Sequence, residues 1–277
     1  MAKTKLGALR AADWAVRLLL ICLVLAISCS KLTDKLGGDF AGGPEDLAGN
    51  IGAEAEALIA DAFRNVDPAR LLDFHVHLIG LGSSGSGAFI NPRLESLWHP
   101  FDYIRTSIYK SAAGIEDDSE ADAQYLARLR ALIRHIPQGR YAIMAFDKHY
   151  REDGTVDLER TPFFMPNDTV YGIARENPAR FVPMISVHPY RSDALRELDK
   201  WAEQGVRLVK WLPNAMGIDP SDERIDPFYS TMVRHGMILL THTGEEQAVD
   251  AEDRQALGNP LLLRRPLERG VTVIMAH

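Results

Sequence analysis

Six short apolar runs, separated by longer polar segments, constrain the fold of this chain more than any other feature. The runs are nearly continuous, and several are rich in β-branched or aromatic residues, as is typical of strands buried on both faces. They occupy residues 71–78, 141–146, 181–187, 206–212, 237–241 and 271–276. Residues 119–135 and 193–204 lie between runs and carry apolar side chains at helical spacing. This alternation predicts an α/β fold with a parallel sheet, either a closed barrel or an open, doubly wound one.

Polar side chains at the ends of the runs distinguish a barrel from an open sheet. Histidine, lysine or aspartate lies in or directly after every run: His75, His77, Asp147, Lys148, His149, His188, Lys210, His242 and His277. In a (β/α)8 barrel all strand C-termini meet at one mouth, whereas in an open sheet only the strands near the topological switch point do so. The sequence therefore predicts a TIM-type (β/α)8 barrel. Because six runs are two short of eight, we expect the barrel to be truncated after strand 6.

The first residues have the pattern of an export signal rather than of a folded domain. Basic residues precede an apolar run over residues 18–27, as in a secretory signal. The run is shorter than the ~20 residues that a membrane-spanning helix needs. It is followed by Ser28-Cys29, which resembles the cleavage site of a bacterial lipoprotein and would place a lipid on Cys29. An ordinary cleaved signal and an uncleaved anchor are the alternatives, and all three imply export.

The chain is therefore expected to have three parts. Residues 1–29 form the signal peptide, lipoprotein signal or anchor. Residues 30–52 are rich in Gly, Asp and Lys and are expected to form a flexible linker. Residues 53–277 are expected to form the barrel domain, incomplete at its C-terminus. We expect the protein to be attached to a membrane through its N-terminal lipid or anchor, or to be periplasmic or otherwise extracytoplasmic.

Composition argues against several other kinds of protein. The net charge is −7, which gives no reason to expect a nucleic-acid partner. Both cysteines, Cys22 and Cys29, lie near the N-terminus, so the rest of the chain has neither a disulfide framework nor a cysteine-based zinc site. No Gly-x-Gly-x-x-Gly follows a predicted strand and opens a helix, which argues against a nucleotide-binding domain.

His75 and His77 form the strongest candidate metal site. Side chains two residues apart on a strand point to the same side, so both imidazoles can face the barrel interior at one height. Two such rings can bind one ion, and for zinc the metal–nitrogen distance is about 2.0–2.1 Å. A lone histidine at a strand end is more often structural than a ligand, and the further histidines at later strand ends are what favour a metal here. Asp73 has the same parity and can bond backbone or support a ligand.

Five more polar residues are candidates for the site. Lys210 lies in an otherwise apolar run, where burial of its charge is costly. It either reaches the mouth as a cation or reacts with CO₂ to give an anionic carbamate that bridges two metals. His188 can shape the pocket, contact substrate or bind metal, and Asn214 can contact substrate. Glu245 and Glu246 follow the fifth run and can orient ligands or cap a helix.

The ordered set of site residues resembles the amidohydrolase superfamily, and most closely its amidohydrolase-related, family 2 branch. The resemblance covers residues 71–277 and rests on Asp73-x-His75-x-His77, Lys210, Thr241-His242-Thr243-Gly244 and Met275-Ala276-His277. It implies a metal-dependent (β/α)8 barrel that hydrolyses C–N, C–O or P–O bonds. One sub-branch decarboxylates aromatic or unsaturated acids instead.

The resemblance also implies a role for individual residues. His75 and His77 would be the first-strand metal ligands and His242 the fifth-strand ligand. His277 would bind a second metal or, in a protein with one metal, act as a catalytic residue that contacts substrate. Lys210 would be the bridging carbamate of a two-metal catalytic site. The family also uses an aspartate at the end of its eighth strand, which the six runs do not include, so the resemblance concerns the intact barrel.

We therefore expect a metal-dependent hydrolase that uses a metal-activated water on a C–N, C–O or related bond of a small-molecule substrate. Zinc is the first choice of divalent metal, as one or two ions. The alternatives are a metal-dependent decarboxylase of the same fold, and a catalytically inactive, membrane-tethered binding protein or truncated remnant. A carbamylated Lys210 with two metals would favour hydrolysis, whereas one metal and an unmodified Lys210 would leave decarboxylation open.

Overall fold

A computed structural model describes residue 44 and residues 51–135, 139–249 and 251–277 of the chain. The predicted signal over residues 1–29, including Cys29, lies outside the described residues, as does nearly all of the predicted linker over residues 30–52. Within the part of the chain that the structure describes, no helix has both the length and the apolar character needed to span a bilayer.

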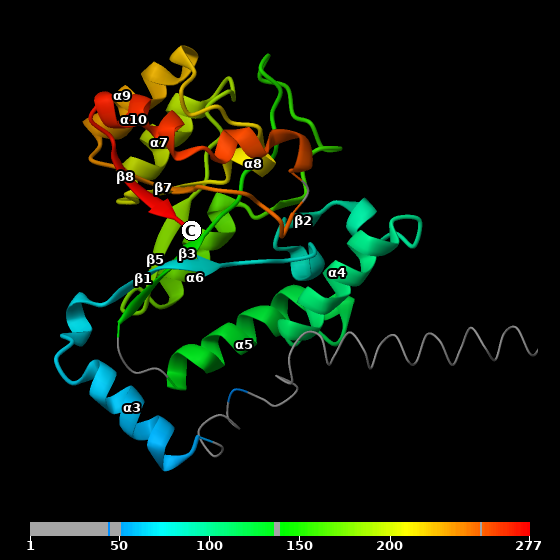
Figure 1. Cartoon of the computed structure of the whole chain (residues 1–277), viewed down its shortest axis with the longest axis vertical. Coiled ribbons are helices and arrows are strands. Elements are labelled where there is room, and N and C mark those ends of the chain that lie inside the picture. The colour runs from blue at the N-terminus through cyan, green and yellow to red at the C-terminus, as the bar shows by residue number, and fades with distance from the viewer. Residues whose placement is uncertain (1–43, 45–50, 136–138, 250) are drawn as a thin grey trace, which may run out of the picture.

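Six parallel strands form the central sheet and follow one another in chain order. They are β1 (Leu72–His77), β3 (Arg140–Met144), β5 (Phe181–Ile185), β6 (Leu208–Trp211), β7 (Ile238–His242) and β8 (Thr272–Ala276). Each strand coincides with one predicted run to within a few residues, and the sheet curls into a half-barrel (Figure 1). The predicted α/β class is therefore confirmed, and the strands fit the first six of a (β/α)8 barrel.

The position of each strand in the sheet explains its burial. The four inner strands have a neighbour on both sides, and their residues are mostly buried. The strands β1 and β8 form the two edges and remain partly accessible, with Phe74 38% and Met275 60% exposed. A closed barrel has no such edges, so these strands mark where the half-barrel is open.

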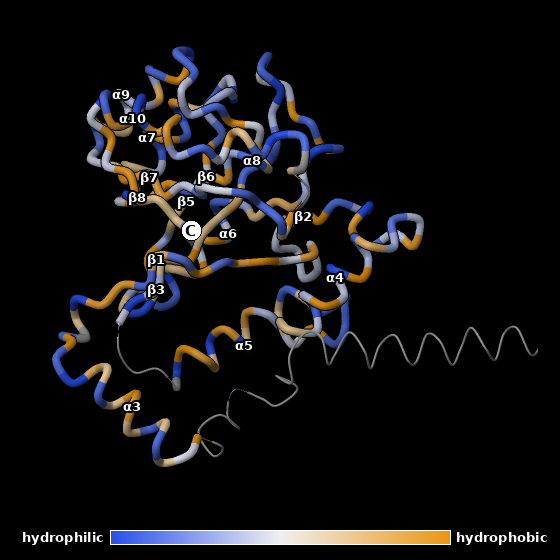
Figure 2. The backbone as a smooth tube through the Cα atoms, viewed as in Figure 1, coloured by the Kyte–Doolittle hydropathy of each residue, from blue (hydrophilic) through white to orange (hydrophobic). Residues whose placement is uncertain are grey.

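Helices connect the strands and cover the sheet. They are α4 (Pro100–Ala112), α5 (Ala121–His135), α6 (Asn167–Glu176), α7 (Ala194–Glu203), α8 (Pro213–Met216), α9 (Asp226–Arg234) and α10 (Arg264–Glu268). The helices α5 and α7 match the two predicted helical segments. Leu198 and Trp201 of α7 are buried in the core, and burial of each such side chain contributes about 1.5–3 kcal/mol. Apolar residues run along β7 and β8, whereas the surrounding turns are largely polar (Figure 2).

The long connection between β1 and β3 extends beyond the sheet. It contains β2 (Phe89–Ile90), which pairs antiparallel with β4 (Phe163–Phe164), and it also contains α4. Both β2 and α4 lie on the side of the sheet toward which β1 runs (Figure 1). This connection is therefore placed beside the C-terminal ends of the strands. A further helix, α3 (Ala53–Phe63), has no buried residue and lies apart from the sheet.

Candidate functional site

Four histidines from three strands form a continuous row at the C-terminal ends of the sheet. The ring centroids of His77 and His75 on β1 are 4.9 Å apart. The His75 ring lies 5.0 Å from that of His277, which directly follows β8. The His277 ring in turn lies 4.8 Å from that of His242 at the end of β7. The structure thus brings together the four histidines that the sequence singles out as ligands or catalytic residues.

Packing and a hydrogen bond fix the inner end of this row. The ring of Phe146, which is 2% exposed, stacks on His77 with a centroid separation of 5.2 Å and an interplanar angle of 16°. The Tyr125 hydroxyl on α5 donates a 2.7 Å hydrogen bond to the backbone carbonyl of His77. These contacts restrain both the ring and the backbone of His77, so the strand end is held in place from two sides.

The surroundings favour the neutral form of three histidines of the row, His75, His77 and His242. Burial, with a smaller contribution from the positive charge of Lys210, lowers the pKa of His75 to about 4 and that of His77 to about 3. Burial also lowers the pKa of His242, against the opposing charge of Glu246. A neutral imidazole has a lone pair available for a metal ion, so His75 and His77 are in the ligand-competent state at neutral pH.

Lys210 lies on β6 and is 1% exposed. Burial lowers the pKa of its ammonium group to about 8, and the carboxylate of Glu246 opposes this shift. The neutral amine, which is the form that reacts with CO₂, is therefore more populated near neutral pH than in an exposed lysine. Lys210 pairs in register with Leu240 of β7, two residues before His242, and its charge lowers the pKa of His75, His77 and His242.

The donor set and its spacing fit a divalent metal. Two imidazoles on one tetrahedral zinc ion have ring centroids ~5.2 Å apart, given zinc–nitrogen distances of about 2.0–2.1 Å. The centroid separations of 4.8, 4.9 and 5.0 Å along the row are close to this value. As the side chains stand, however, no group of three or more His, Cys, Asp or Glu in the described ranges is arranged to hold an ion. Coordination therefore requires the rings to turn about their side-chain bonds.

A polar cavity of about 590 Å³ lies between α4 and the loop that follows β7. It is lined by Arg93, Phe101, Asp102, Arg105, Glu245, Glu246, Gln247, Val249 and Gln255. Arg105 donates to Asp102 at 2.8 Å and to the carbonyl of Gln247 at 3.2 Å, which joins the two walls. Glu246 connects the cavity to the histidine row, because its Oε2 lies 3.6 Å from Nδ1 of His242. No sequence spacing marks the α4 residues as part of a site, so only the fold reveals them.

His188, predicted to contact substrate or metal, is fully buried and engaged with other parts of the protein. Its Nε2 lies 2.8 Å from the carbonyl of Met216, and its Nδ1 accepts a 3.2 Å hydrogen bond from the backbone of Tyr190. Its own backbone amide donates to Asp147, which also pairs with Arg191 at 2.9 Å. Both ring nitrogens of His188 therefore already have protein partners.

His149, at the end of the second predicted run, is also buried, at 6% exposure. Neither of its ring nitrogens has a hydrogen-bond partner among the described residues. Burial lowers the pKa of His149 to about 4, with a further contribution from Arg254. The ring packs against Gly217, where any larger residue would collide with its Nε2.

Asn214, predicted to contact substrate, lies on α8 and is fully buried. Its Nδ2 donates to the carbonyl of Gly244 at 3.2 Å and to Oε1 of Gln255 at 3.0 Å. Its Oδ1 has no hydrogen-bond partner within the described part of the chain. Asn214 thus supports the loop after β7, and Gln255 is a residue of this network that sequence reasoning did not single out.

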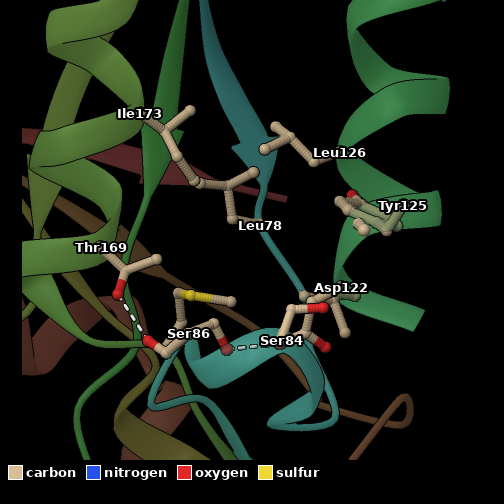
Figure 3. Close-up of a pocket in the computed structure, with 11 residues that line it drawn as sticks. Leu78, Ser84, Ser86, Asp122, Tyr125, Leu126, Thr169 and Ile173 are labelled. Atoms are coloured by element: carbon tan, nitrogen blue, oxygen red, sulfur yellow. Dashed lines mark hydrogen bonds between the residues drawn. The ribbon is translucent and has the colours of Figure 1, made fainter. Parts of the chain in front are cut away.

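A second, apolar cavity of about 250 Å³ lies beside the glycine-rich segment that follows β1 (Figure 3). It is lined by Leu78, which directly follows β1, by Leu126 on α5 and by Ile173 on α6. The Asp122 carboxylate accepts hydrogen bonds from the backbone of Leu81, at 2.6 Å, and from the Ser86 hydroxyl. The segment is therefore fixed to the start of α5.

No curated protein matches the chain. Among solved structures, the uncharacterized TIM-barrel protein Bb4693 from Bordetella bronchiseptica is 17% identical, with a TM-score of 0.48. That match covers 74% of this chain and 66% of the other, so this chain spans just under two thirds of its length.

The family assignment rests on the sequence itself. The profile of the family described as amidohydrolase matches residues 73–277, which is most of the chain and begins at Asp73, within β1. The match includes all four histidines of the row and Lys210. Members of this family generally depend on a metal ion, in keeping with the neutral imidazoles described above. This chain belongs to the amidohydrolase family.

Proposed function

We propose that this protein is a metal-dependent hydrolase that acts on a small-molecule substrate, with zinc as the preferred ion. The observation that carries the proposal is the row of His77, His75, His277 and His242, with neighbouring ring centroids 4.8 to 5.0 Å apart. Imidazoles at this spacing are a donor set that zinc favours. The family membership of residues 73–277 supports the same reaction class.

In this proposal the histidines of the row have different roles. His75, His77 and His242 would hold the ion, and His277 would bind a second ion or contact the substrate. A bound zinc ion supplies Lewis acidity that activates water for attack on a C–N, C–O or related bond. Phe146 excludes water from one side of His77, because it stacks on that ring and is itself 2% exposed.

Lys210 has one of two roles in this proposal. Its amine nitrogen would attack the carbon of CO₂ and lose a proton, and the resulting carbamate would supply anionic oxygens to hold metal. Otherwise it remains a cation that contacts the substrate. The lowered pKa of the amine, about 8, supports the first role. Intact mass measured at low temperature with CO₂ present distinguishes them, because the carbamate adds one CO₂ to the chain and Lys210→Met abolishes this addition.

The cavity between α4 and the loop after β7 is the proposed substrate site. Its volume of about 590 Å³ lies within the ~300–1,000 Å³ of pockets for small molecules. Its walls carry both guanidinium and carboxylate groups, which favours a polar substrate. The net charge of the whole chain is −7, which does not favour binding of a negatively charged nucleic acid.

We also propose that the protein is exported and attached to a membrane. The basic residues before the apolar run at 18–27, and the Ser28-Cys29 pair after it, support a lipid on Cys29. Labelled fatty acid should be incorporated into the wild-type protein and not into a Cys29→Ser variant. Incorporation that survives this substitution would contradict lipidation at Cys29.

Metal content tests the central proposal directly. The purified chain should contain zinc, measured by elemental analysis, and His75→Ala should lose most of it. His235→Ala is the matched control, because His235 pairs with Asp199 away from the row, and it should retain the metal. Unchanged zinc in His75→Ala would overturn the ligand assignment. With the metal-loaded protein, release of CO₂ rather than uptake of water by a substrate would identify a decarboxylase instead.

A further inference from the structure

The Glu246 side chain is held in one position by its own loop. Its Oε1 accepts hydrogen bonds from the backbone amides of Ala248, at 2.6 Å, and Val249, at 3.3 Å. The other carboxylate oxygen, Oε2, lies 3.6 Å from Nδ1 of His242, and both side chains are less than 10% exposed. One oxygen therefore fixes the carboxylate while the other faces the imidazole.

Gln255 holds the backbone of Glu246 at two points. It belongs to η6 (Glu252–Gly258), a 3-10 helical segment. Its Nε2 donates to the Glu246 carbonyl at 2.6 Å, and its Oε1 accepts from the Glu246 amide at 2.8 Å. The buried Asn214 on α8 donates to the same Oε1 at 3.0 Å. The peptide groups of Glu246 are thus tied, through Gln255, to the helix that follows β6.

The ends of this loop are also joined to each other. The Gly244 amide donates a 2.8 Å hydrogen bond to the Gly258 carbonyl. Only glycine fits at position 258, because a Cβ there would collide with the Gly244 carbonyl and lie 2.7 Å from Nδ2 of Asn214. Arg254 donates to the Asn214 carbonyl at 2.9 Å. The two ends of the loop, at Gly244 and Gly258, are therefore tied together, and the Glu246 carboxylate faces His242 from within it.

We propose that Glu246 is a positioning residue for His242, and that Gln255 holds it in that role. The inference rests on the proposed function, in which His242 is a metal ligand. A carboxylate beside an imidazole selects the ring nitrogen that carries the proton and increases the basicity of the other. With its proton on Nδ1, facing Glu246, His242 has its Nε2 lone pair available for the metal. Such a ring gives up the 3.3 Å contact between Nε2 and the Glu245 carbonyl.

The competing view is that Glu246 only stabilises the turn at residues 247–249. The two views differ in what removal of the charge does. In Glu246→Gln the amide oxygen can still accept the bonds from Ala248 and Val249, so the turn is preserved. The negative charge opposite His242 is lost. A purely structural residue would change folding stability in such a variant without changing metal affinity.

The experiment measures binding of zinc to the metal-free full chain by titration calorimetry, and the visible absorption of the cobalt(II)-loaded protein. We expect Glu246→Gln to weaken zinc binding by about 10- to 100-fold, the usual effect of removing a partner of a liganding histidine. It should also alter the cobalt(II) spectrum, since that spectrum reports ligand geometry. Gln255→Leu should act in the same direction by a smaller factor.

Glu203→Gln is the matched control, because it removes the same charge from an exposed side chain at the end of α7, which contributes no residue to the histidine row or the cavity. It should bind zinc within twofold of the wild type. The unfolding temperature of each metal-free variant identifies any general loss of structure. Zinc affinity within twofold of wild type in Glu246→Gln, with binding lost in His242→Ala, would overturn the inference and leave the proposed function intact. Unchanged binding in His242→Ala would instead contradict the assignment of His242 as a ligand.

Discussion

The rings of His75 and His277 lie 5.0 Å apart, although their strands form opposite edges of the six-stranded sheet. Five strand-to-strand pairings separate β1 from β8 along the sheet. Neighbouring strands are about 4.8 Å apart, so a flat sheet would hold these two edges more than 20 Å from each other. The curvature of the half-barrel is therefore what forms the histidine row.

Replacement of Lys210 by methionine should stabilise the metal-free protein at pH 7 by about 3 kcal/mol. Burial lowers the pKa of Lys210 from 10.5 to about 8, so the unfolded chain binds this proton more tightly than the folded chain does. The loss of folding stability caused by burying the Lys210 ammonium has its full value below pH 8. Between pH 8 and 10.5 this loss decreases by about 1.4 kcal/mol per pH unit as the pH rises. Urea unfolding at pH 7 and pH 9.5 measures both values.

Lys200→Met is the control for that substitution. Lys200 lies on α7 with its side chain 45% exposed, so its replacement should change the free energy of unfolding by less than about 1 kcal/mol at either pH. If Lys210→Met gave no gain at pH 7, the amine would not carry the burial penalty that its position implies.

Acid should destabilise the metal-free protein partly through His77. Burial lowers the pKa of His77 from 6.5 to about 3, so between these values the unfolded chain binds the proton and the folded chain does not. Stability due to this group is therefore present above pH 6.5 and is lost as the pH falls toward 3. In His77→Asn the fall in unfolding free energy should be shallower by about 1.4 kcal/mol per pH unit. Equal slopes in wild type and variant, in chemical denaturation between pH 4 and 6, would contradict burial of a neutral His77.

Two glycine substitutions should have opposite effects. Gly258→Ala places a Cβ against the Gly244 carbonyl and Asn214, so it should destabilise the protein by several kcal/mol or displace the loop after β7. Gly172→Ala on α6 meets no atom within 4 Å and should stabilise the helix by up to about 1 kcal/mol. Thermal unfolding of the two variants beside wild type measures both changes. A neutral Gly258→Ala would show that the loop does not pack as tightly as described.

Removal of the Asp122 carboxylate should free the segment that follows β1. The Asp122 carboxylate accepts hydrogen bonds from the Leu81 amide and the Ser86 hydroxyl. The Asp122 backbone amide separately donates to the Ser83 hydroxyl at 3.0 Å, and this bond remains after the side chain is removed. Asp122→Ala should therefore increase hydrogen exchange in residues 80–91, measured by mass spectrometry. Asp118→Ala, which removes an exposed carboxylate paired with Lys110, is the control. Equal exchange in both variants would mean that other contacts fix the segment.

The strands and the histidines could be predicted because both depend on short-range periodicity. A continuous apolar run is sufficient to mark a buried strand, and β5 and β6 match their runs closely. The two-residue spacing of His75 and His77 places them on one face whatever surrounds them. Parallel order then follows from the intervening helices, so the meeting of strand ends at one mouth required no knowledge of side-chain packing.

The helix α4 and the loop network could not be predicted in this way. On α4 the large apolar residues do not mark a buried face, since Phe101 is 87% exposed and Ile104 43% exposed, so no helical stripe is evident. Gln255 meets Glu246 only because the loop closes on itself at Gly244 and Gly258. Contacts of this kind depend on loop geometry, and nothing in the spacing of residue types along the chain indicates them.

The order of strands has a consequence for how the protein assembles. Each strand pairs with its nearest predecessor in the chain, so the sheet can grow from local contacts that form readily during folding. The row of histidines behaves differently, because His75 can meet His277 only after β8 has joined the sheet and the sheet has curved. A metal ion held by this row would bind only chains in which both β1 and β8 are in place. Retention of zinc would then report that β8 has joined the sheet, and chains in which it has not would be distinguished by their failure to hold zinc.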